Sequence, residues 1–364
     1  MAATRADRAW MSKALALAER GRGRTSPNPM VGALVVADDG VAIGRGAHEV
    51  AGGPHAEVHA LAEAGERARG ATLYCTLEPC SHVGRTGPCA PLVARAGIRR
   101  AVIAVEDPNP KVSGRGIEYL RAHGVEVVVG VERDAAERLN RGFFSVMRRG
   151  RPFVTLKAAL SLDAKVAAAP GQRTALTGED AGILVHRERA EIDAIAIGSG
   201  TVLADDPLLT PRIAYRCRPL VRVIFDRRLR TPSRASIFGT LECGPVMIVT
   251  DATDRDSVLR GEMLVRAGAT IERVPGDGPF LERAMRRLAE REVRTMIVEG
   301  GPVLHEAFWR AGLVDRLQLF VSPTVLGDGG VDWMAVPQGV VATLAEMCTQ
   351  AVGVDVLIEG LVRR

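Results

Sequence analysis

Short apolar runs alternate with segments of helical periodicity along the whole chain, and this alternation limits the possible folds most strongly. In the first half, the runs ATLYCTLEP (71–79), RRAVIAVED (99–107) and VEVVVG (125–130) have the length of buried strands. Helical patterns separate them, and strands separated by helices predict a largely parallel sheet. The sequence therefore predicts the α/β class. Further elements expected in this half are helices over 8–21, 56–68, 90–97, 116–124 and 135–150 and a strand hairpin over 30–48.

The second half repeats this architecture, which favours two domains in the 364-residue chain. A basic segment that contains glycine and proline, RRGRP (148–152), is the best candidate for the boundary between them. We therefore expect domains over 1–150 and 151–364. The strands expected in the second domain span 153–163, 190–200, 219–226, 245–250, 293–301 and 316–327, and a helix is expected over 302–312.

The composition excludes several classes of protein. Hydrophobic residues make up 47% and charged residues 25% of the chain, as in ordinary globular proteins. No apolar run approaches the roughly 20 residues of a membrane span, and the charged segment 1–21 is unlike a signal peptide. The net charge of +5 is dispersed and aromatic residues make up only 4%, so the pattern of a nucleic-acid-binding protein is missing. A mild positive charge suits a small phosphorylated substrate.

The six cysteines are too few for a disulfide framework in a chain of this length. Cys75, Cys80 and Cys89 lie close together in the sequence, which in a cytoplasmic enzyme indicates a metal or catalytic site. The lack of a disulfide framework, of a membrane span and of a signal peptide leads us to expect a cytoplasmic protein. For the reasons given above, we expect neither a membrane nor a nucleic acid as its partner. The isolated cysteines are expected to be buried as small apolar residues: Cys217, Cys243 and Cys348.

The segment GPHAEVHAL (53–61) places His55, Glu57 and His59 close together. On a helix, His55 and His59 would share a face and could both bind zinc, but the metalloprotease motif needs glutamate directly after the first histidine, where this chain has Ala56. Alternatively, His55 and Glu57 serve one site, and His59, one turn further along the helix, is either packed or supports the residues of that site from behind. This requires His55 to lie at or just before a helix start, and the glycines and proline before it are typical of a helix entry. The spacing alone leaves both interpretations open.

The downstream segment TLEPCSHVGRTGPC (76–89) favours the second interpretation. Its proline–cysteine pair and second cysteine complete the order found in zinc deaminases, in which one histidine and two cysteines bind zinc and a nearby glutamate stays off the metal. Three protein ligands leave one zinc position open for water, and a free carboxylate can then move the proton of that water. We therefore predict His55, Cys80 and Cys89 as zinc ligands and Glu57 as the catalytic proton shuttle.

Eight residues separate Cys80 from Cys89, whereas deaminases of nucleic acids and free bases usually have two. This spacer and the motifs TSPNPMVGALVV, HAEVHAL and EDPNPKVSGRG resemble the deaminase domain of the bifunctional riboflavin-biosynthesis deaminase–reductases. The resemblance covers residues 7–150 and implies a cytidine-deaminase-like α/β/α fold, a zinc ion and deamination of 2,5-diamino-6-ribosylamino-4(3H)-pyrimidinone 5′-phosphate. It also implies that Asn28 and His48 contact the base or ribose and that Arg85 contacts the phosphate.

In the second half, two transitions from strand to glycine are candidates for phosphate binding. GSGTVL (198–203) lacks the third glycine of the dinucleotide-binding motif, so it carries little weight by itself. EGGPVL (299–304) follows a strand and places proline at a helix start, which makes a backbone cradle at the positive end of a helix. Lys157 lies in an otherwise apolar strand, where a lysine needs a partner or a function.

The motifs FVTLKAALSLDAKVA, GSGTVLADDPLLTPR and IVEGGPVLHEAFWRAGLVD are similar to the reductase domain of the same family. The similarity covers 152–364 and implies a dihydrofolate-reductase-like α/β fold and NADPH-dependent reduction of the ribosyl group to a ribityl group. The implied substrate-binding residues are Lys157, Arg173, Arg189, Leu209, Arg212 and Glu299. The implied cofactor-binding residues are Ala159, Ala175, Thr201, Asp205, Gly301, Pro302 and Val303, and the implied catalytic residues are Lys157 and Asp205.

The second half departs from that family at three positions. Ala164 stands where the family usually has glycine, and Arg173 and Ala175 stand where it usually has serine and tryptophan. One competing hypothesis is a single-activity nucleotide or tRNA-base deaminase with a non-catalytic C-terminal ligand-binding domain, but the retained Lys157, Glu299 and glycine loops argue against it. Another, a nucleic-acid-binding module, conflicts with the low aromatic content. We expect a homo-oligomeric enzyme whose substrate is a small phosphorylated pyrimidine.

Overall fold

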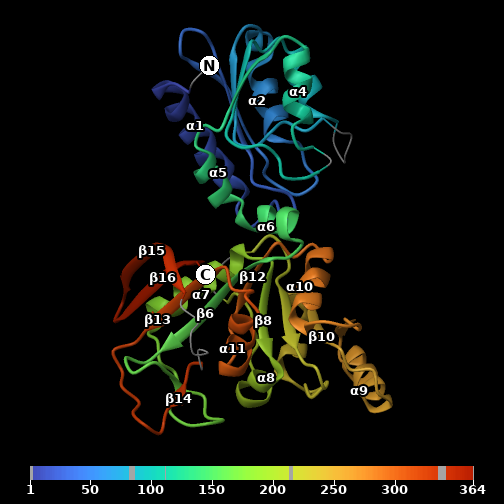
Figure 1. Ribbon diagram of the computed structural model, residues 1–364, viewed down its shortest axis with the longest axis vertical. Coiled ribbons are helices and arrows are strands. Elements are labelled where there is room, and N and C mark those ends of the chain that lie inside the picture. Colours follow the sequence, from blue (N-terminus) through green and yellow to red (C-terminus); the bar gives the residue numbers. More distant parts are fainter. Residues whose placement is uncertain (1–2, 82–86, 111, 213–215, 335–341, 364) are drawn as a thin grey trace. The chain divides into compact units, whose positions relative to one another are not determined.

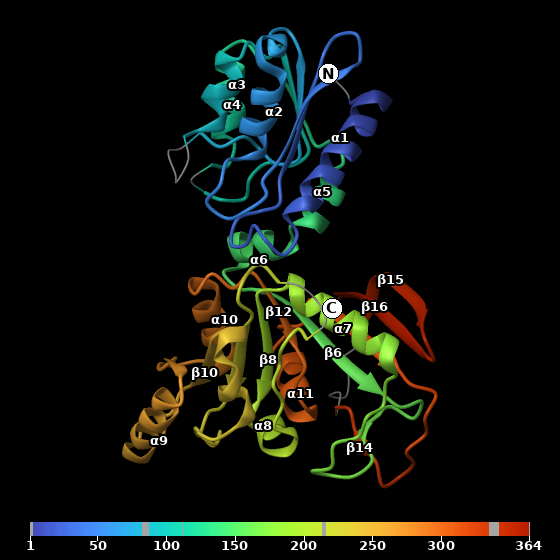
Figure 2. The same ribbon diagram turned by 180° about the vertical axis from the view of Figure 1, so that it is seen from behind.

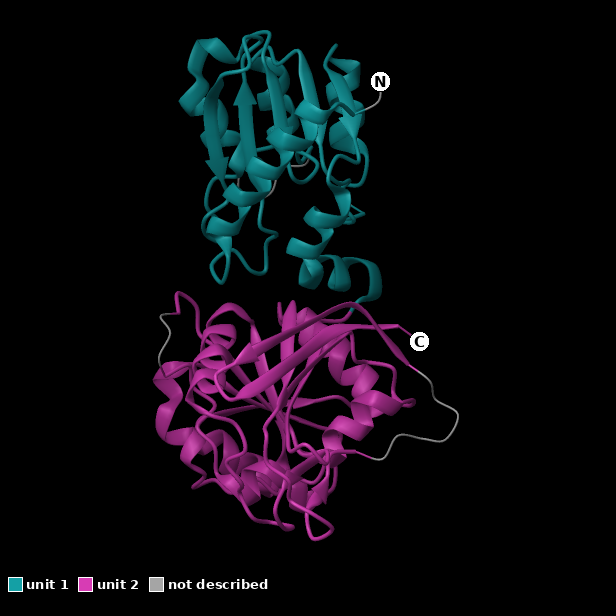
Figure 3. Ribbon diagram, turned by 90° about the vertical axis from the view of Figure 1, so that its left-hand side faces the viewer, with its two compact units in different colours: residues 1–150 teal, residues 151–364 magenta. Residues whose placement is uncertain are grey.

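The structure is a computed structural model that describes residues 3–81, 87–110, 112–212, 216–334 and 342–363. The chain forms two compact units, Met1–Gly150 and Arg151–Arg364, which Figure 3 shows in different colours. The boundary between them falls within the basic segment 148–152. Each unit has its own sheet and its own apolar core.

Unit 1 contains a five-stranded sheet in the order β2-β1-β3-β4-β5. Strand β1 pairs antiparallel with β2 and β3, whereas β3, β4 and β5 are parallel. The strands are β1 (Gly32–Val36), β2 (Ala42–Ala47), β3 (Thr72–Cys75), β4 (Arg100–Ile103) and β5 (Glu126–Val129). The helices are α1 (Arg5–Ala18), α2 (Ala56–Ala64), α3 (Cys89–Arg95), α4 (Arg115–Ala122), α5 (Arg133–Leu139) and α6 (Arg141–Arg149).

Two glycines let helices pack closely on opposite faces of this sheet. A Cβ atom on Gly32 would lie 2.0 Å from the carbonyl oxygen of Ala14 in α1, and one on Gly46 would lie 1.9 Å from that of Ala56 in α2. Gly32 pairs with Ala47 across the ladder, so Gly32 and Gly46 point to opposite faces. Figures 1 and 2 show α1 on one face and α2 and α4 on the other. Unit 1 therefore has the expected α/β/α layers.

The helix expected over 135–150 is in fact two helices, α5 and α6, which meet at Asn140. The Asn140 side chain accepts a hydrogen bond from the Met30 amide (2.8 Å) and donates one to the Met30 carbonyl (2.9 Å). Its backbone leaves the helical range, with φ −112° and ψ 28°. A contact with a residue far away in the sequence therefore ends α5, and the local helical pattern gave no sign of it.

Unit 2 contains a nine-stranded sheet in the order β11-β10-β9-β8-β12-β6-β13-β16-β15 and a separate sheet of β7 and β14. Neighbours from β11 to β13 are parallel, and β16 and β15 add an antiparallel edge. The strands are β6 (Phe153–Leu160), β7 (Lys165–Ala167), β8 (Ala194–Gly198), β9 (Val221–Phe225), β10 (Val246–Thr250), β11 (Ala269–Arg273), β12 (Thr295–Val298), β13 (Arg316–Val321), β14 (Val331–Asp332), β15 (Thr343–Val352) and β16 (Asp355–Arg363). The helices are α7 (Glu179–Glu191), α8 (Ser199–Asp205), α9 (Arg255–Arg266), α10 (Phe280–Glu290) and α11 (Pro302–Arg310).

Some expectations for unit 2 are wrong in detail. The segment expected as a strand over 190–200 begins in α7 and ends in α8, so only its middle part is β8. The hairpin of β15 and β16 was not predicted, because β15 is largely exposed and lacks the apolar run of a buried strand. The isolated cysteines are not buried: Cys217 and Cys348 are exposed and Cys243 is partly exposed.

Candidate active sites

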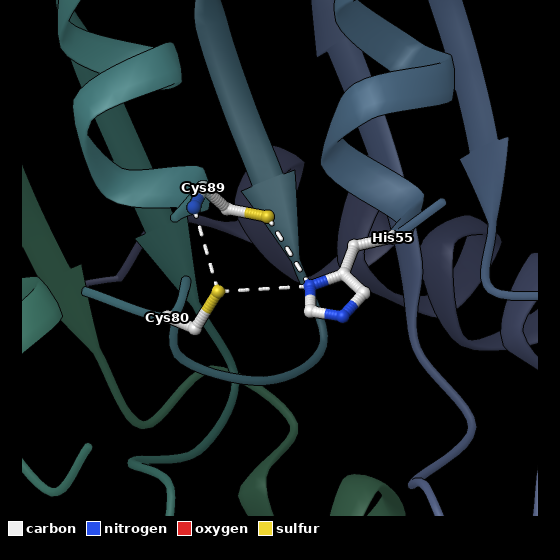
Figure 4. Close-up of side chains that lie close together, drawn as sticks. All are labelled: His55, Cys80 and Cys89. Atoms are coloured by element: carbon white, nitrogen blue, oxygen red, sulfur yellow. Dashed lines mark hydrogen bonds between the residues drawn. The ribbon is translucent and has the colours of Figure 1, made fainter. Parts of the chain in front are cut away.

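The three predicted metal ligands come together beside the starts of α2 and α3 (Figure 4). His55 immediately precedes α2 in an extended conformation, Cys89 is the first residue of α3, and Cys80 lies in the segment between β3 and α3. The Nδ1 atom of His55 lies 3.6 Å from Sγ of Cys80 and 3.3 Å from Sγ of Cys89. All three ligand atoms lie within 4.8 Å of one another.

These separations fit a tetrahedral zinc ion. With Zn–S distances of about 2.3 Å and Zn–N distances of about 2.0 Å, a sulfur and a nitrogen ligand should lie about 3.5 Å apart. Hydrogen bonds from Cys89 and His55 lower the pKa of the Cys80 thiol, whereas the hydrogen bond to Cys80 and burial raise the pKa of Cys89. A dication between the two sulfur atoms would stabilise both as thiolates. The donor set and its spacing therefore fit zinc.

Glu57 lies in the first turn of α2 and is only 3% exposed. Burial raises its pKa to about 6, although the neighbouring His55 opposes this shift. A carboxyl group with a pKa close to neutrality can both accept and release a proton. Because His55 precedes the helix, the side chains of His55 and Glu57 can reach the same site although they are only two residues apart. His59 is exposed and lies outside the cluster, so the structure does not support the metalloprotease interpretation and does not pack His59 in the core. Besides burial of the ring, the charge of His59 lowers the pKa of His48, so His59 lies near the site.

Asn28 and His48, predicted to contact the substrate, lie beside the metal ligands. The His48 ring stands edge-on to that of His55, with ring centroids 5.4 Å apart. Its Nδ1 atom donates a hydrogen bond to the Pro54 carbonyl (3.0 Å), so Nε2 accepts one from the Asn28 amide (3.3 Å). Burial lowers the pKa of His48, which keeps the ring neutral. Arg85 lies outside the described residues.

Glu78 is a residue of this site that sequence reasoning missed. It lies two residues before Cys80, is 3% exposed, and its carboxylate accepts four backbone hydrogen bonds of 2.8 to 3.2 Å. The donors are the amides of Asp107, Gly114, Gly116 and Ile117. Glu78 thus ties the segment 107–117 to the turn that carries Cys80. A charged residue at the end of an apolar strand was the signal that could have revealed it.

Unit 2 contains a cavity of about 1420 Å³ at the carboxyl ends of β8, β9 and β12. Parallel sheets commonly bind ligands at this end of their strands. The volume exceeds the upper range of about 1,000 Å³ for drug-sized ligands, so a cofactor and a substrate can share it. The predicted residues that line it are Lys157, Ala159, Arg173, Arg189, Thr201, Asp205, Leu209, Arg212, Glu299, Gly301, Pro302 and Val303. Ala175 is exposed and lies outside the lining.

The floor of this cavity carries a carboxylate between two cations. Glu299 forms two hydrogen bonds with Arg189, at 3.1 and 2.8 Å, and its Oε2 atom lies 3.9 Å from the Lys157 ammonium. Burial alone would raise the pKa of Glu299, but the charges of Arg189 and Lys157 outweigh it and lower the pKa to about 2. The group therefore carries a net positive charge, which suits an anionic ligand.

The glycines before α11 form a backbone surface at the cavity wall. Gly301 precedes the helix, Pro302 is its first residue, and the Gly301 amide donates a hydrogen bond to Thr201 Oγ1 (3.2 Å). A Cβ atom on Gly300 would lie 2.7 Å from the Leu304 side chain, so no larger residue fits there without a shift. The amide end of α11 and this close-packed backbone fit the phosphates of a dinucleotide. The cavity therefore fits NADPH.

Several residues in and around the cavity have a left-handed backbone that side chains disfavour, and one of them is Asp206, with φ 42°. Leu209, predicted to bind substrate, has φ 55°, and Ala164 has φ 59°. Glycine adopts this conformation without steric cost, which explains why it suits position 164. Arg173 lines the cavity with an exposed side chain.

Comparisons with known proteins agree for both units. Residues 4–105 match the family model of the cytidine and deoxycytidylate deaminase zinc-binding region, and residues 152–358 match the RibD C-terminal domain. The riboflavin biosynthesis protein RibD of Aquifex aeolicus is 42% identical over 323 residues, covering 89% of this chain and 88% of that protein. The RibD protein of Bacillus amyloliquefaciens is 43% identical over 318 residues, covering 87% of this chain and 85% of that protein.

Solved structures agree over the full length. Acinetobacter baumannii RibD is 36% identical with a TM-score of 0.88, covering 99% of both chains. A diaminohydroxyphosphoribosylaminopyrimidine deaminase/5-amino-6-(5-phosphoribosylamino)uracil reductase from Thermotoga maritima is 33% identical with a TM-score of 0.83, covering 98% of both chains. These matches confirm the fold class expected for the two units. Among the described helices, none is long and apolar enough to cross a membrane.

Proposed function

Because the chain belongs to the RibD family of riboflavin-biosynthesis proteins, and is therefore a zinc-dependent deaminase joined to an NADPH-dependent reductase, we propose that its two activities divide between the two units. Residues 1–150 would carry out deamination and residues 151–364 reduction. The observation that carries this division is that each unit holds a separate site, a metal-ligand cluster in one and a large cavity in the other.

In unit 1, we assign His55, Cys80 and Cys89 as the zinc ligands and Glu57 as the proton shuttle. Zinc, when bound, lowers the pKa of its water so that hydroxide is available near pH 7. The Glu57 carboxylate accepts the proton of that water and passes it to the ring nitrogen and then to the leaving ammonia. Its buried position and its pKa of about 6 support this role, because the carboxyl group can change protonation state near neutral pH.

The substrate proposed for unit 1 is 2,5-diamino-6-ribosylamino-4(3H)-pyrimidinone 5′-phosphate. Asn28 and His48 lie next to the metal ligands, where they can orient the base or ribose by hydrogen bonds. The Asn28 amide has a second hydrogen atom besides the one donated to His48, and its carbonyl can accept a bond. Arg85 is proposed to bind the phosphate, as the family resemblance implies.

In unit 2, we assign Lys157 as the proton donor of the reduction. Conversion of the ribosylamine to a ribitylamine breaks the C1′–O4′ bond, adds hydride to C1′ and adds a proton to O4′. NADPH, when bound, supplies the hydride. The Lys157 ammonium reaches into the cavity beside Glu299 and Arg189, so it can give its proton to O4′ while the arginine holds anionic substrate.

The remaining assignments divide the cavity wall between the two ligands. The cofactor would lie against the α8 and α11 side, and the substrate against the Arg189 side. The proposed cofactor contacts are Ala159, Thr201, Asp205, Gly301, Pro302 and Val303, with Asp205 also in a catalytic role. The proposed substrate contacts are Arg173, Arg189, Leu209, Arg212 and Glu299. Ala175, which lies outside the lining, is left out of the cofactor site.

A pair of substitutions tests the division. Glu57→Gln should abolish ammonia release from the diamino substrate and leave NADPH oxidation with the deaminated substrate unchanged. Lys157→Ala should do the opposite. Ammonia release is measured with a coupled enzyme and NADPH oxidation by absorbance, on the same purified protein. Loss of NADPH oxidation in a folded Glu57→Gln protein would contradict the two-site proposal.

We also propose a cytoplasmic homo-oligomer. All six cysteines are free, and two of them are proposed to bind zinc as thiolates, which suits a reducing compartment. The exposed strand β15 forms one edge of the nine-stranded sheet and carries the exposed Met347, so its backbone can pair with a second copy of the chain. Light scattering after gel filtration measures the mass directly, and a single-chain mass would contradict this proposal.

A further inference from the structure

Strands β7 and β14 form an arm that is separate from the main sheet of unit 2. We define this β7–β14 arm as residues 161–174 and 326–334. Its two segments are joined by their strand pairing and by hydrogen bonds from the Leu326 and Gly327 amides to the Asp163 carboxylate (3.1 and 2.7 Å). An ion pair of 2.7 Å links Lys165 to Asp332. The arm thus has internal contacts of its own, and its residues Trp333 and Met334 also pack against the apolar core of unit 2.

The arm forms one wall of the reductase cavity. Val166, Ala167 and the run 169–174 line the cavity from one segment of the arm, and Val331 lines it from the other. The lining also includes the start of α11. The position of the arm relative to α11 therefore sets the shape of the space that substrate and cofactor occupy.

A hydrogen bond connects the arm to α11. The indole Nε1 of Trp333 donates to Nδ1 of His305 at 2.9 Å, with the two rings nearly perpendicular at 82°. His305 lies on α11, is 2% exposed, and itself lines the cavity. On the arm, the Trp333 amide also donates to the Ala164 carbonyl (3.2 Å). Trp333, in one segment of the arm, thus bonds both to the other segment and to α11.

The chemistry of the two rings makes this bond specific. An indole N–H can only donate, so Nδ1 of His305 must be unprotonated and its ring proton must lie on Nε2. Burial, together with the positive charge of Lys157, lowers the pKa of His305 to about 4, so the neutral ring persists near pH 7. A backbone hydrogen bond involving Val298 acts in the opposite direction and raises this pKa, but it does not reverse the shift. Nothing in the proposed reaction uses His305, so its burial calls for another role.

We propose that His305 and Trp333 are positioning residues of the reductase, whose hydrogen bond fixes the β7–β14 arm at the wall of the cavity. This inference rests on the proposed assignment of the cavity as the reductase site. Without the bond, the arm can still contact the bound substrate and cofactor. Ligand binding must then order the arm, which costs part of the binding free energy. Loss of the bond should therefore weaken binding and leave the chemical step nearly unchanged.

The test compares three variants of the full-length protein. Trp333→Phe keeps the ring but removes the donor, and His305→Leu removes the acceptor. His305→Asn places an amide oxygen near the position of Nδ1 and should keep the bond. The first two variants should raise the KM for NADPH or for the deaminated substrate about three- to tenfold, as expected for one net hydrogen bond, with kcat changed less than about twofold. His305→Asn should stay close to the unchanged protein.

The double variant decides whether the two residues act through one bond. Trp333→Phe combined with His305→Leu should raise KM no more than either change alone, because the second change removes nothing further. Additive effects, an unchanged KM, or a loss of kcat at constant KM would overturn the inference. Trp10→Phe, the same change in unit 1, is the matched control and should leave reductase KM unaffected. If Trp333→Phe fails to fold, His305→Leu against His305→Asn decides alone.

Failure of this inference and failure of the proposed function are distinguishable. If the unaltered protein oxidises NADPH with the deaminated substrate and the variants match it, only the positioning role fails. If Lys157→Ala leaves NADPH oxidation intact, the assignment of the cavity itself fails. Ammonia release from the diamino substrate, measured on every variant, reports whether unit 1 remains folded.

Discussion

The two sites of this protein depend on single side chains to different degrees. In unit 1, three ligand atoms within 4.8 Å of one another converge on one point. In unit 2, a cavity of about 1420 Å³ is bounded by segments from Lys157 to Val331, and part of its wall is the glycine backbone before α11. A metal centre with three protein ligands loses its metal when one ligand is removed. In a large cavity, by contrast, each wall residue contributes only a small part of the free energy of ligand binding. Apart from changes at Lys157, the proposed proton donor, single substitutions should therefore act more strongly on deamination than on reduction.

The largest effect is expected when a metal ligand is removed. Cys80→Ser or Cys89→Ser should lower zinc from about one ion per chain to nearly none, because a neutral hydroxyl is a poor substitute for a thiolate, and ammonia release should be lost with it. Zinc is measured by atomic emission on the purified protein. Cys75→Ser is the matched control: Cys75 is buried near the site but lies outside the ligand cluster, so zinc and activity should remain. Full zinc in both ligand variants would contradict the assignment.

Glu57→Gln should come next, with deamination slowed by roughly 10²- to 10⁴-fold, which is the usual contribution of a general acid–base residue. The change preserves shape and removes only the proton-carrying group. Zinc content should remain unchanged, which separates this variant from the cysteine variants. A Glu57→Gln protein that has lost its zinc would show instead that the glutamate is a ligand.

The same contrast explains how much the sequence could reveal. The proposed metal centre has a readable sequence pattern, because it needs particular side chains. The structure brings His55, Cys80 and Cys89 together and buries Glu57 in the first turn of α2. The cavity of unit 2 has little recognisable pattern in the sequence, because part of its wall is backbone, which does not require particular side chains. Lys157 and the glycines before α11 stood out in the sequence by themselves, whereas the other proposed residues came only from family resemblance, which also included the exposed Ala175.

Elements whose cause lies elsewhere in the fold were missed in both units. The break at Asn140 depends on Met30, and the role of Glu78 depends on four amides that lie 29 to 39 residues further along the chain. In the hairpin of β15 and β16, strand β15 is largely exposed and carries no apolar periodicity. The strands and helices predicted from the sequence, by contrast, lie largely where they were expected, because their apolar spacing is local. The helices α7, α9 and α10 and the strand β11 were not expected.

Glu78→Gln tests whether the proposed zinc site of unit 1 also depends on how the surrounding backbone is held in place. Each carboxylate oxygen of Glu78 accepts two amide hydrogens, so an amide group would set its own N–H atoms against two of these donors. Unpaired buried donors cost roughly 1–3 kcal/mol each, so unit 1 should unfold at a lower temperature, with the KM for the diamino substrate raised about tenfold. Calorimetry and ammonia release measure the two effects. Glu106→Gln, which alters a carboxylate on the exposed side of the same segment, is the control. Unchanged unfolding in Glu78→Gln would show that the four bonds are not needed.

The smallest expected effect concerns Ala164, where this chain departs from the glycine usual in its family. Its φ of 59° costs an alanine roughly 1–2 kcal/mol, whereas glycine would lose about 0.5–1 kcal/mol through its freer unfolded state. Ala164→Gly should therefore stabilise unit 2 by up to about 1 kcal/mol, seen as a rise of a few degrees in its unfolding temperature. Ala167→Gly is the matched control, because Ala167 lies in strand β7 with ordinary geometry, and it should destabilise. Because the Ala164 carbonyl accepts the Trp333 amide, a relaxed backbone at this position should leave the reductase KM unchanged or lower it slightly. A destabilised Ala164→Gly protein would mean that the alanine methyl group contributes more by packing than its backbone strain costs, and that the wall of the cavity depends on side chains after all.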